Sequence, residues 1–133
     1  MNSHSYASSG LAALMLCAAM GCGGPLLIIP GGALSGTVVP APASWEGTDS
    51  PFLDLELQPG DPYSVQLNYV VQDGKLYIDP AEGRRWFDYL REDARVRARL
   101  SGNVYELTAV LVGKPGELNG FDATRFVYRL DPR

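Results

Sequence analysis

The sequence is poor in the side chains that most enzymes use for nucleophilic or zinc chemistry. It contains one histidine, His4, and two cysteines, Cys17 and Cys22, and all three lie within the first 22 of its 133 residues. Ser-His-Asp and Cys-His catalysis require a histidine base, and zinc sites are built mainly from cysteine and histidine. The sequence also lacks a P-loop pattern and a G-x-G-x-x-G pattern that opens a helix. We therefore expect no catalytic residue of these types and no metal site.

Basic residues are missing from the first half of the chain. Every lysine and arginine lies at or after Lys75, and the formal net charge is −4. The acidic residues that precede Lys75 are Glu46, Asp49, Asp54, Glu56, Asp61 and Asp73. A nucleic-acid-binding chain needs a basic surface. We therefore expect no nucleic-acid partner.

An uncharged apolar run covers residues 10–21. A helix that crosses a bilayer needs about 20 residues, so this shorter run is typical of the hydrophobic part of a signal peptide. The run ends in Ala19-Met20-Gly21-Cys22, which resembles the lipobox of bacterial lipoproteins, although no basic residue precedes it. We therefore predict a signal peptide over residues 1–21 and lipidation of Cys22. The alternatives are an ordinary secretory signal and a buried helix with two structural cysteines.

Cleavage before Cys22 would place the protein in the bacterial cell envelope. The lipobox resemblance implies a membrane anchor, in which each buried methylene contributes about 0.8 kcal/mol. Gly23 would then be the second residue, which is typical of lipoproteins on the periplasmic face of the outer membrane. Cleavage would also remove His4 and Cys17, so the mature chain would have neither a histidine nor a second cysteine for a disulfide.

Residues 22–51 are rich in glycine and proline and are expected to form an arm. The segment Leu-Leu-Ile-Ile at residues 26–29 is too apolar to lie free in water, so it should pack on the domain or touch the membrane. Residues 33–39 could form an edge strand, because the prolines that follow exclude a central one. Trp45 either covers the mouth of a barrel or lies on the surface.

Residues 52–133 show the pattern of an antiparallel β domain. Residues 52–58 alternate leucine with Asp54 and Glu56, and this alternation places both carboxylates on an outward, solvated face. Residues 63–71 also alternate, with Val65, Leu67, Tyr69 and Val71 on one face and Ser64, Gln66 and Asn68 on the other. Residues 125–130 form a closing strand, with Val127 and Arg129 outward.

Two hairpin turns set the strand pairing. Asp73-Gly74 favours a type I′ turn, which would pair Val71 with Leu76 and Tyr69 with Ile78. A turn at Gly102-Asn103 would place Leu100 opposite Tyr105, Ala98 opposite Leu107 and Arg99 opposite Glu106 on the outer face. The row Arg95, Arg97 and Arg99 is then an exposed strand face balanced by acids, although it could also bind an anionic partner.

A helix is predicted between the two hairpins, over about Pro80–Glu92. Asp79 can accept hydrogen bonds from free N–H groups, Pro80 suits the first helical position, and Glu82 completes a capping box. Trp86, Phe87 and Leu90 share one side of this helix. The sequence therefore predicts a mainly β fold, a small antiparallel split β-barrel of six or seven strands with one α-helix.

The order of these elements resembles the split-barrel family, which includes pyridoxamine 5'-phosphate oxidase-like flavoproteins and deazaflavin (F420)-dependent nitroreductase-like proteins. Residues 67–77 (LNYVVQDGKLY) are similar to the family's hairpin, and residues 93–98 (DARVRA) to the segment that follows its helix. The resemblance covers about residues 52–130. It implies FMN or deazaflavin (F420) as possible cofactors and a homodimer as the assembly.

Six residues are candidates for binding such a cofactor: Ser64, Gln66, Asn68, Arg84, Arg85 and Trp86. For the two arginines, a solvated helix face is favoured over cofactor binding. Asp61 stands where the family commonly has a basic residue for the cofactor phosphate, and a carboxylate there argues against phosphate binding.

Three functions remain open on the sequence. The first is a membrane-tethered oxidoreductase that uses a flavin or deazaflavin on a small oxidised substrate. The second is a split barrel without a cofactor, acting as a non-catalytic binding or interaction domain. The third is a structural envelope lipoprotein with no small ligand. We rank the split barrel without a cofactor above the oxidoreductase for two reasons. Asp61 argues against phosphate binding, and reduced cofactors are scarce in an exported setting.

Overall fold

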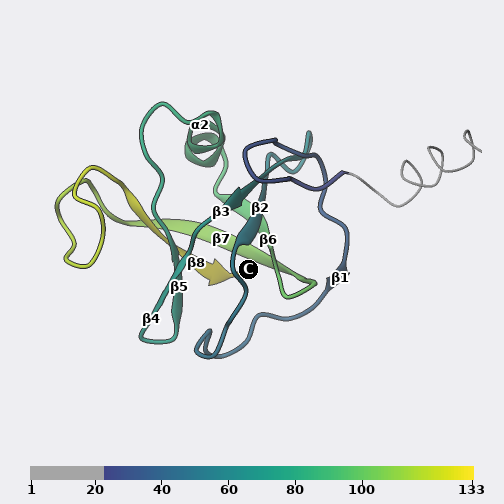
Figure 1. Ribbon diagram of the computed structural model, residues 1–133, viewed down its shortest axis with the longest axis horizontal. Helices are drawn as coiled ribbons and strands as arrows, with labels where there is room; N and C mark the ends of the chain where they lie inside the picture. The colour runs from purple at the N-terminus through teal and green to yellow at the C-terminus, as the bar shows by residue number, and fades with distance from the viewer. Residues whose placement is uncertain (1–22) are drawn as a thin grey trace, which may run out of the picture.

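The computed structural model describes residues 23–133 (Figure 1). The predicted signal peptide, residues 1–21, and the predicted lipidation site, Cys22, lie outside these residues. The fold is mainly β, a strongly curled antiparallel half-barrel with one short helix among the described residues. The predicted fold class is therefore confirmed.

The described chain forms eight strands, one more than the upper end of the predicted range. The strands are β1 (Thr37–Val38), β2 (Leu53–Leu57), β3 (Tyr63–Leu67), β4 (Val70–Gln72), β5 (Lys75–Ile78), β6 (Arg95–Leu100), β7 (Asn103–Gly113) and β8 (Val127–Pro132). The helix, labelled α2, spans Arg85–Glu92. Within residues 23–133 no helix has the length and apolar character to cross a membrane.

The sheet follows the order β3-β2-β6-β7-β8-β5-β4, and β1 adds to β7 in parallel. Its two end strands, β3 and β4, are separated in sequence by only Asn68 and Tyr69. The chain therefore passes from one end of the sheet to the other within two residues, which requires the sheet to curl (Figure 1). The predicted single strand over residues 63–71 is thus two strands, broken at this corner.

The first hairpin has the predicted register, but its ladder ends at Val70 and Tyr77 and does not include the predicted pair of Tyr69 with Ile78. Val71 pairs with Leu76, and the turn residues Asp73 and Gly74 both have positive φ, 52° and 72°. A two-residue turn of this kind matches the twist of the flanking strands.

The second hairpin differs from its predicted register by two residues. Its turn is Ser101-Gly102, both with positive φ, so Leu100 pairs with Asn103 and Ala98 with Tyr105. The predicted pairing of Arg99 with Glu106 is therefore wrong. A shift of two residues keeps each side chain on its predicted face, because side chains alternate with period two.

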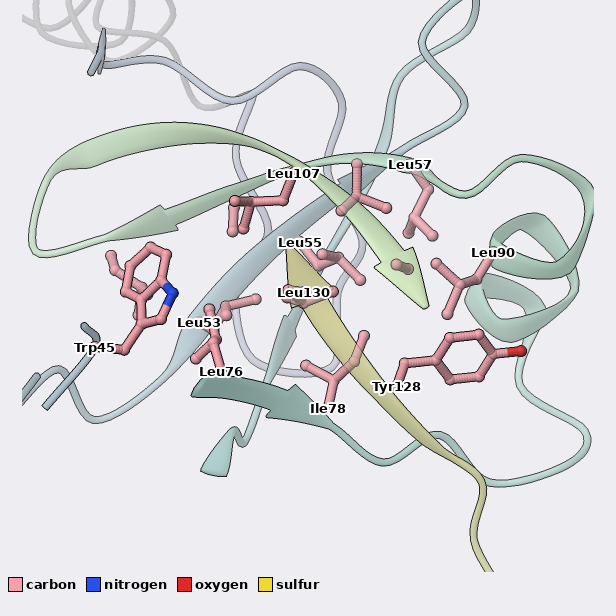
Figure 2. Packing of buried hydrophobic residues seen from close by; sticks show 14 of the residues in the cluster. Trp45, Leu53, Leu55, Leu57, Leu76, Ile78, Leu90, Leu107, Tyr128 and Leu130 are labelled. Carbon is pink, nitrogen blue, oxygen red and sulfur yellow. The ribbon is translucent and has the colours of Figure 1, made fainter. Parts of the chain in front are cut away.

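The core fills the concave side of the sheet. Leu53, Leu55 and Leu57 of β2 are fully buried, and Phe87 and Leu90 of α2 are almost completely so. Figure 2 shows the cluster extending from Trp45 at one end to Leu90 and Tyr128 at the other. One prediction for the closing strand is wrong, because Val127 is buried beside the β-bulge of β7.

Helix α2 begins five residues later than predicted. Pro80 is buried and its carbonyl accepts a hydrogen bond from Phe126 N, and Gly83 has φ +84°, which a right-handed helix cannot contain. Asp79 therefore caps no helix and instead lies 3.7 Å from Arg125. Glu82 contacts Arg91 at 2.6 Å, so the predicted capping box is absent.

The arm packs along the sheet. Trp45 is 5% exposed and contacts Tyr105 edge-on, with ring centroids 4.9 Å apart. The Trp45 N–H donates to Gly74 O, and Gly74 N–H donates to Glu46 Oε1, so the arm is joined to the turn of the first hairpin. The predicted edge strand is present as β1.

Two ion pairs cross the outer face of the sheet between β2 and β6. Asp54 contacts Arg99 at 2.7 Å, and Glu56 contacts Arg97 at 3.3 Å. Leu34 N also donates to Glu56 Oε2 at 2.7 Å. Glu56 is only 5% exposed, so the predicted solvated face for these carboxylates is wrong. The arm lies over them.

We expect Glu56→Gln to destabilise the fold, because the neutral amide leaves Arg97 without its anion in a largely buried place. The free energy of unfolding should fall by about 2 kcal/mol, as Arg97 keeps part of its hydration. Urea unfolding followed by circular dichroism measures this. Glu106→Gln is the matched control, because Glu106 is half exposed and lies 3.8 Å from Arg133. Equal losses in both variants would contradict the assignment.

Candidate functional site

A cavity in the described part of the chain lies between the arm, β3 and the start of α2. It has a volume of about 450 Å³, within the usual range for ligand sites. Its walls come from segments far apart in sequence: residues 27–30 of the arm, residues 63–68, residues 78–86 and Arg125. We call it the arginine cavity, after Arg84 and Arg85 in its wall.

Five of the six predicted binding residues line this cavity. Gln66 and Asn68 come from β3 and the corner after it, and Arg84, Arg85 and Trp86 come from the start of α2. They meet because β3 and α2 pack together, as shown by the edge-on contact of Tyr63 with Tyr89 at 5.1 Å between centroids.

Ser64 does not line the cavity. It is fully buried under the arm, where its backbone exchanges two hydrogen bonds with Gly31. Its Oγ has no hydrogen-bond partner among the described residues. Alternation of the strand predicted a polar face here, but it could not show that the arm covers that face.

Arg84 and Arg85 differ from the other arginines of the chain. Seven of its nine arginines lie within 4.0 Å of a carboxylate: Arg91, Arg95, Arg97, Arg99, Arg125, Arg129 and Arg133. Arg84 and Arg85 have no such partner within residues 23–133, and both are exposed at the cavity wall. The cavity therefore contains two guanidinium groups whose charge is not neutralised by a close carboxylate.

The wall of the cavity also holds an ion pair, Asp79 with Arg125. Burial raises the pKa of Asp79 above its ordinary value, and the nearby Arg125 offsets this only in part. The charge of this wall thus becomes more positive as pH falls toward the raised pKa.

Gln66 connects the cavity to the ion pairs of the outer face. Its Oε1 accepts from Leu27 N at 3.2 Å, and its Nε2 donates to Asp54 Oδ1 at 3.4 Å. Leu27 and Ile28 in turn form part of the cavity wall. The arm is therefore positioned by the same face of β3 that lines the cavity.

Asp61 is not part of the site. It is exposed in the turn between β2 and β3 and does not line the cavity. The sequence argument against an anion site depended on this residue, so the position of Asp61 removes that argument.

The site can bind but has few groups for catalysis. Among the described residues, its wall combines guanidinium, amide and indole groups with aliphatic side chains, the Asp79 carboxylate and the Tyr63 phenol, and it includes no serine, threonine, cysteine or histidine. Within residues 23–133 there is also no cluster of three histidine, cysteine or acidic side chains that could hold a metal ion. The arrangement suits an anion that also carries an apolar or aromatic part.

Of the 16 residues that line the cavity, sequence reasoning missed 11, among them Asp79, Arg125, Leu27 and Ile28. Asp79 was assigned to the helix cap, Arg125 to the closing strand, and Leu27 and Ile28 to a segment whose contact was left open. The sequence feature that could have indicated Leu27 and Ile28 is their position in an apolar run within an arm that is otherwise rich in glycine and proline.

No protein-family model matches this chain, and no curated protein matches it in sequence.

Proposed function

We propose that the chain is a lipid-anchored protein of the bacterial envelope whose domain is a non-catalytic module that binds an anionic ligand in the arginine cavity. The observation that carries this proposal is the pair Arg84 and Arg85, which line this cavity without a carboxylate partner among the described residues. The proposal keeps Cys22 as the membrane anchor and the periplasmic face of the outer membrane as the location.

The charges of the wall support an anion as the ligand. A guanidinium group donates several hydrogen bonds in a planar arrangement that matches carboxylate and phosphate oxygens. Arg84 and Arg85 are adjacent in sequence at the start of α2, where the helix dipole also favours negative charge. Asn68 and Gln66 add neutral hydrogen-bonding groups on the other side of the cavity.

The apolar part of the wall supports a ligand with more than a charged group. Trp86 is half-buried, and Val65, Leu67 and Pro30 line the same cavity. Indole rings and guanidinium planes both stack on flat ligands. A small inorganic anion alone would leave this surface uncovered.

An oxidoreductase that uses FMN or deazaflavin (F420) is the second candidate, and the observation that favours it is the position of Trp86 beside the two arginines. The indole would pack against a planar ring, and the guanidinium groups would hold a phosphate. The carboxylate of Asp79 in the same wall counts against this cofactor. A purified preparation that is yellow, or that binds FMN or deazaflavin tightly, would place this candidate first.

Acylation of Cys22 tests the anchor. Mass spectrometry of the protein purified from its native membrane should give an N-terminal peptide that begins at Cys22 and carries acyl chains. A mature N-terminus without lipid, or one upstream of Cys22, would show that the predicted anchor is wrong. This measurement is independent of the cavity.

Ligand titration tests the cavity. Trp45→Phe leaves Trp86 as the only indole, so its fluorescence reports binding of inorganic phosphate or FMN to the full chain in detergent. We expect Arg84→Ala and Arg85→Ala each to weaken binding about tenfold, the usual effect of losing a charge-assisted hydrogen bond.

Arg95→Ala is the matched control for the two cavity variants, because Arg95 is exposed, pairs with Asp93 and lies outside the cavity. It should bind as the parent chain does. Equal binding by all four chains, or no binding by any, would refute an anion site at this position.

The pH dependence of binding follows from Asp79. Since its pKa is raised, Asp79 becomes neutral at a higher pH than an ordinary aspartate, and its repulsion of an anion then disappears. Binding of sulfate, whose charge is constant over this range, should therefore tighten as the pH falls from 7 toward 4. Asp79→Asn should bind more tightly at pH 7 and lose this dependence. Asp61→Asn, which changes a carboxylate outside the cavity, should keep it.

A further inference from the structure

Four consecutive aliphatic residues project from the arm into solvent. Their exposed fractions are 64% for Leu26, 66% for Leu27, 97% for Ile28 and 62% for Ile29. The other exposed large apolar side chains of residues 23–133 occur singly along the sequence, at 36–49%. We call residues 26–29 the tip. Such a contiguous apolar surface is unusual for a protein that is surrounded by water only.

The tip is a folded turn. Leu26 N donates to Ile29 O at 2.9 Å and Ile29 N donates to Leu26 O at 2.8 Å, and Leu27 adopts φ +53°. The Leu27 N–H is further held by Gln66 Oε1. These bonds fix the aliphatic side chains outward, and so their exposure is part of the fold.

The base of the tip is fixed to the sheet. Gly31 and Ser64 exchange backbone hydrogen bonds at 2.9 and 2.8 Å. A Cβ atom at Gly31 would collide with the backbone of Gly23 and Gly24, so this close approach requires glycine. The tip is therefore held rigidly against β3, and two of its residues, Leu27 and Ile28, line the arginine cavity.

Cations and an indole lie beside the tip. Leu27 and Ile28 line the same cavity as Arg84, Arg85 and Trp86. An apolar projection next to a tryptophan and to arginines without acidic partners among the described residues is the combination that binds the interface of an anionic bilayer. A soluble partner with an apolar groove would explain the tip but would not need the two cations.

The chain also enters the described fold at the base of the tip. Gly32 N donates to Gly23 O, so Gly23 is held next to the residues that follow the tip. The apolar run of residues 10–21 and Cys22 directly precede it in the sequence. An acylated Cys22 would thus attach the chain to the membrane at the base of the tip.

We infer that the tip inserts into the bilayer interface and that Arg84 and Arg85 bind the phosphates of anionic lipids, so that the arginine cavity opens onto the membrane surface. The assignment of the arginines deepens the proposed function by naming its anion as a lipid headgroup. Insertion of the tip depends only on the aliphatic residues and their rigid support.

The test places an environment-sensitive nitrobenzoxadiazole dye at the tip of the full chain. Cys17 and Cys22 are replaced by serine, and a single cysteine is introduced by Ile28→Cys or, as the control, by Leu111→Cys in β7, which is 44% exposed. The N-terminal residues are identical in both chains, so any attachment that they cause is the same. Each chain is bound to vesicles of phosphatidylcholine, with or without phosphatidylglycerol, and purified by flotation.

We expect the dye at residue 28 to shift to the blue and to resist aqueous iodide on phosphatidylglycerol vesicles, while the dye at residue 111 does neither. Arg84→Ala and Arg85→Ala should each reduce the preference of this signal for anionic vesicles about fivefold. Arg95→Ala should leave it unchanged.

A dye at residue 28 that stays in water on vesicles, or one that is protected equally at residue 111, overturns the insertion of the tip. Protection at residue 28 that appears without vesicles and grows with protein concentration overturns it in favour of a second copy of the chain. An unchanged lipid preference after both arginine substitutions overturns the lipid assignment.

These failures are separate from failure of the proposed function. A chain that binds soluble phosphate beside Trp86 but leaves the tip in water refutes membrane docking alone. A chain whose tip is buried but whose Trp86 responds to neither soluble anions nor anionic vesicles refutes the anion site alone.

Discussion

The ion pairs between β2 and β6 hold the rest of the structure in place. Glu56 accepts hydrogen bonds from both Leu34 N and Arg97, and Arg99 bridges Asp54 to the carbonyl of Ser35. Each pair thus links two neighbouring strands to the arm that crosses them. Buried ion pairs add little net stability because desolvation cancels much of the attraction, but removing one partner leaves a charge with no counterion. Their effect here is to specify where the arm lies.

The position of the arm determines the site. From Leu34 the chain runs back through Gly31, which binds β3 at Ser64, to the tip at residues 26–29. The tip closes one wall of a cavity whose other walls are β3 and the start of α2. Without the arm, the arginines would lie on an open surface and Gln66 would lack its contact with Leu27. The cavity is therefore a product of long-range contacts from a segment that has the composition of a flexible linker.

Sequence reasoning succeeded where local chemistry decides the structure. Asp73-Gly74 forms the turn that its residues favour, and Leu53, Leu55 and Leu57 are buried as their alternation predicts. In Ser101-Gly102-Asn103 two adjacent pairs could each form the turn, so the register was wrong by two residues while the faces remained right. The helix start failed because Gly83 takes a left-handed conformation that cap residues upstream do not reveal.

The sequence was sufficient to name several residues of the candidate site, but it did not show which residues the arm covers and so excludes from the site. Alternation places Gln66 and Asn68 on one face of the strand, and the Arg-Arg-Trp sequence opens the helix, so five of the lining residues could be named. From the same alternation we predicted Ser64 as a binding residue and a solvated face for Asp54 and Glu56, and both predictions were wrong. Periodicity shows which way a side chain points but not what covers it. The arm covers all three, and no local pattern in its glycines and prolines specifies that path.

The charge of the whole chain restricts how the cavity can meet an anion. All 11 basic and all 15 acidic residues lie within residues 23–133, so the folded part has a net charge of −4 and is repelled by an anionic surface at long range. The Debye length at physiological ionic strength is about 8 Å, so only the charges nearest such a surface are felt after contact. Arg84 and Arg85 attract lipid phosphates only when the domain is already held close and correctly oriented. A flexible tether would supply proximity without orientation, whereas the rigid tip, attached where the chain enters the fold, would supply both.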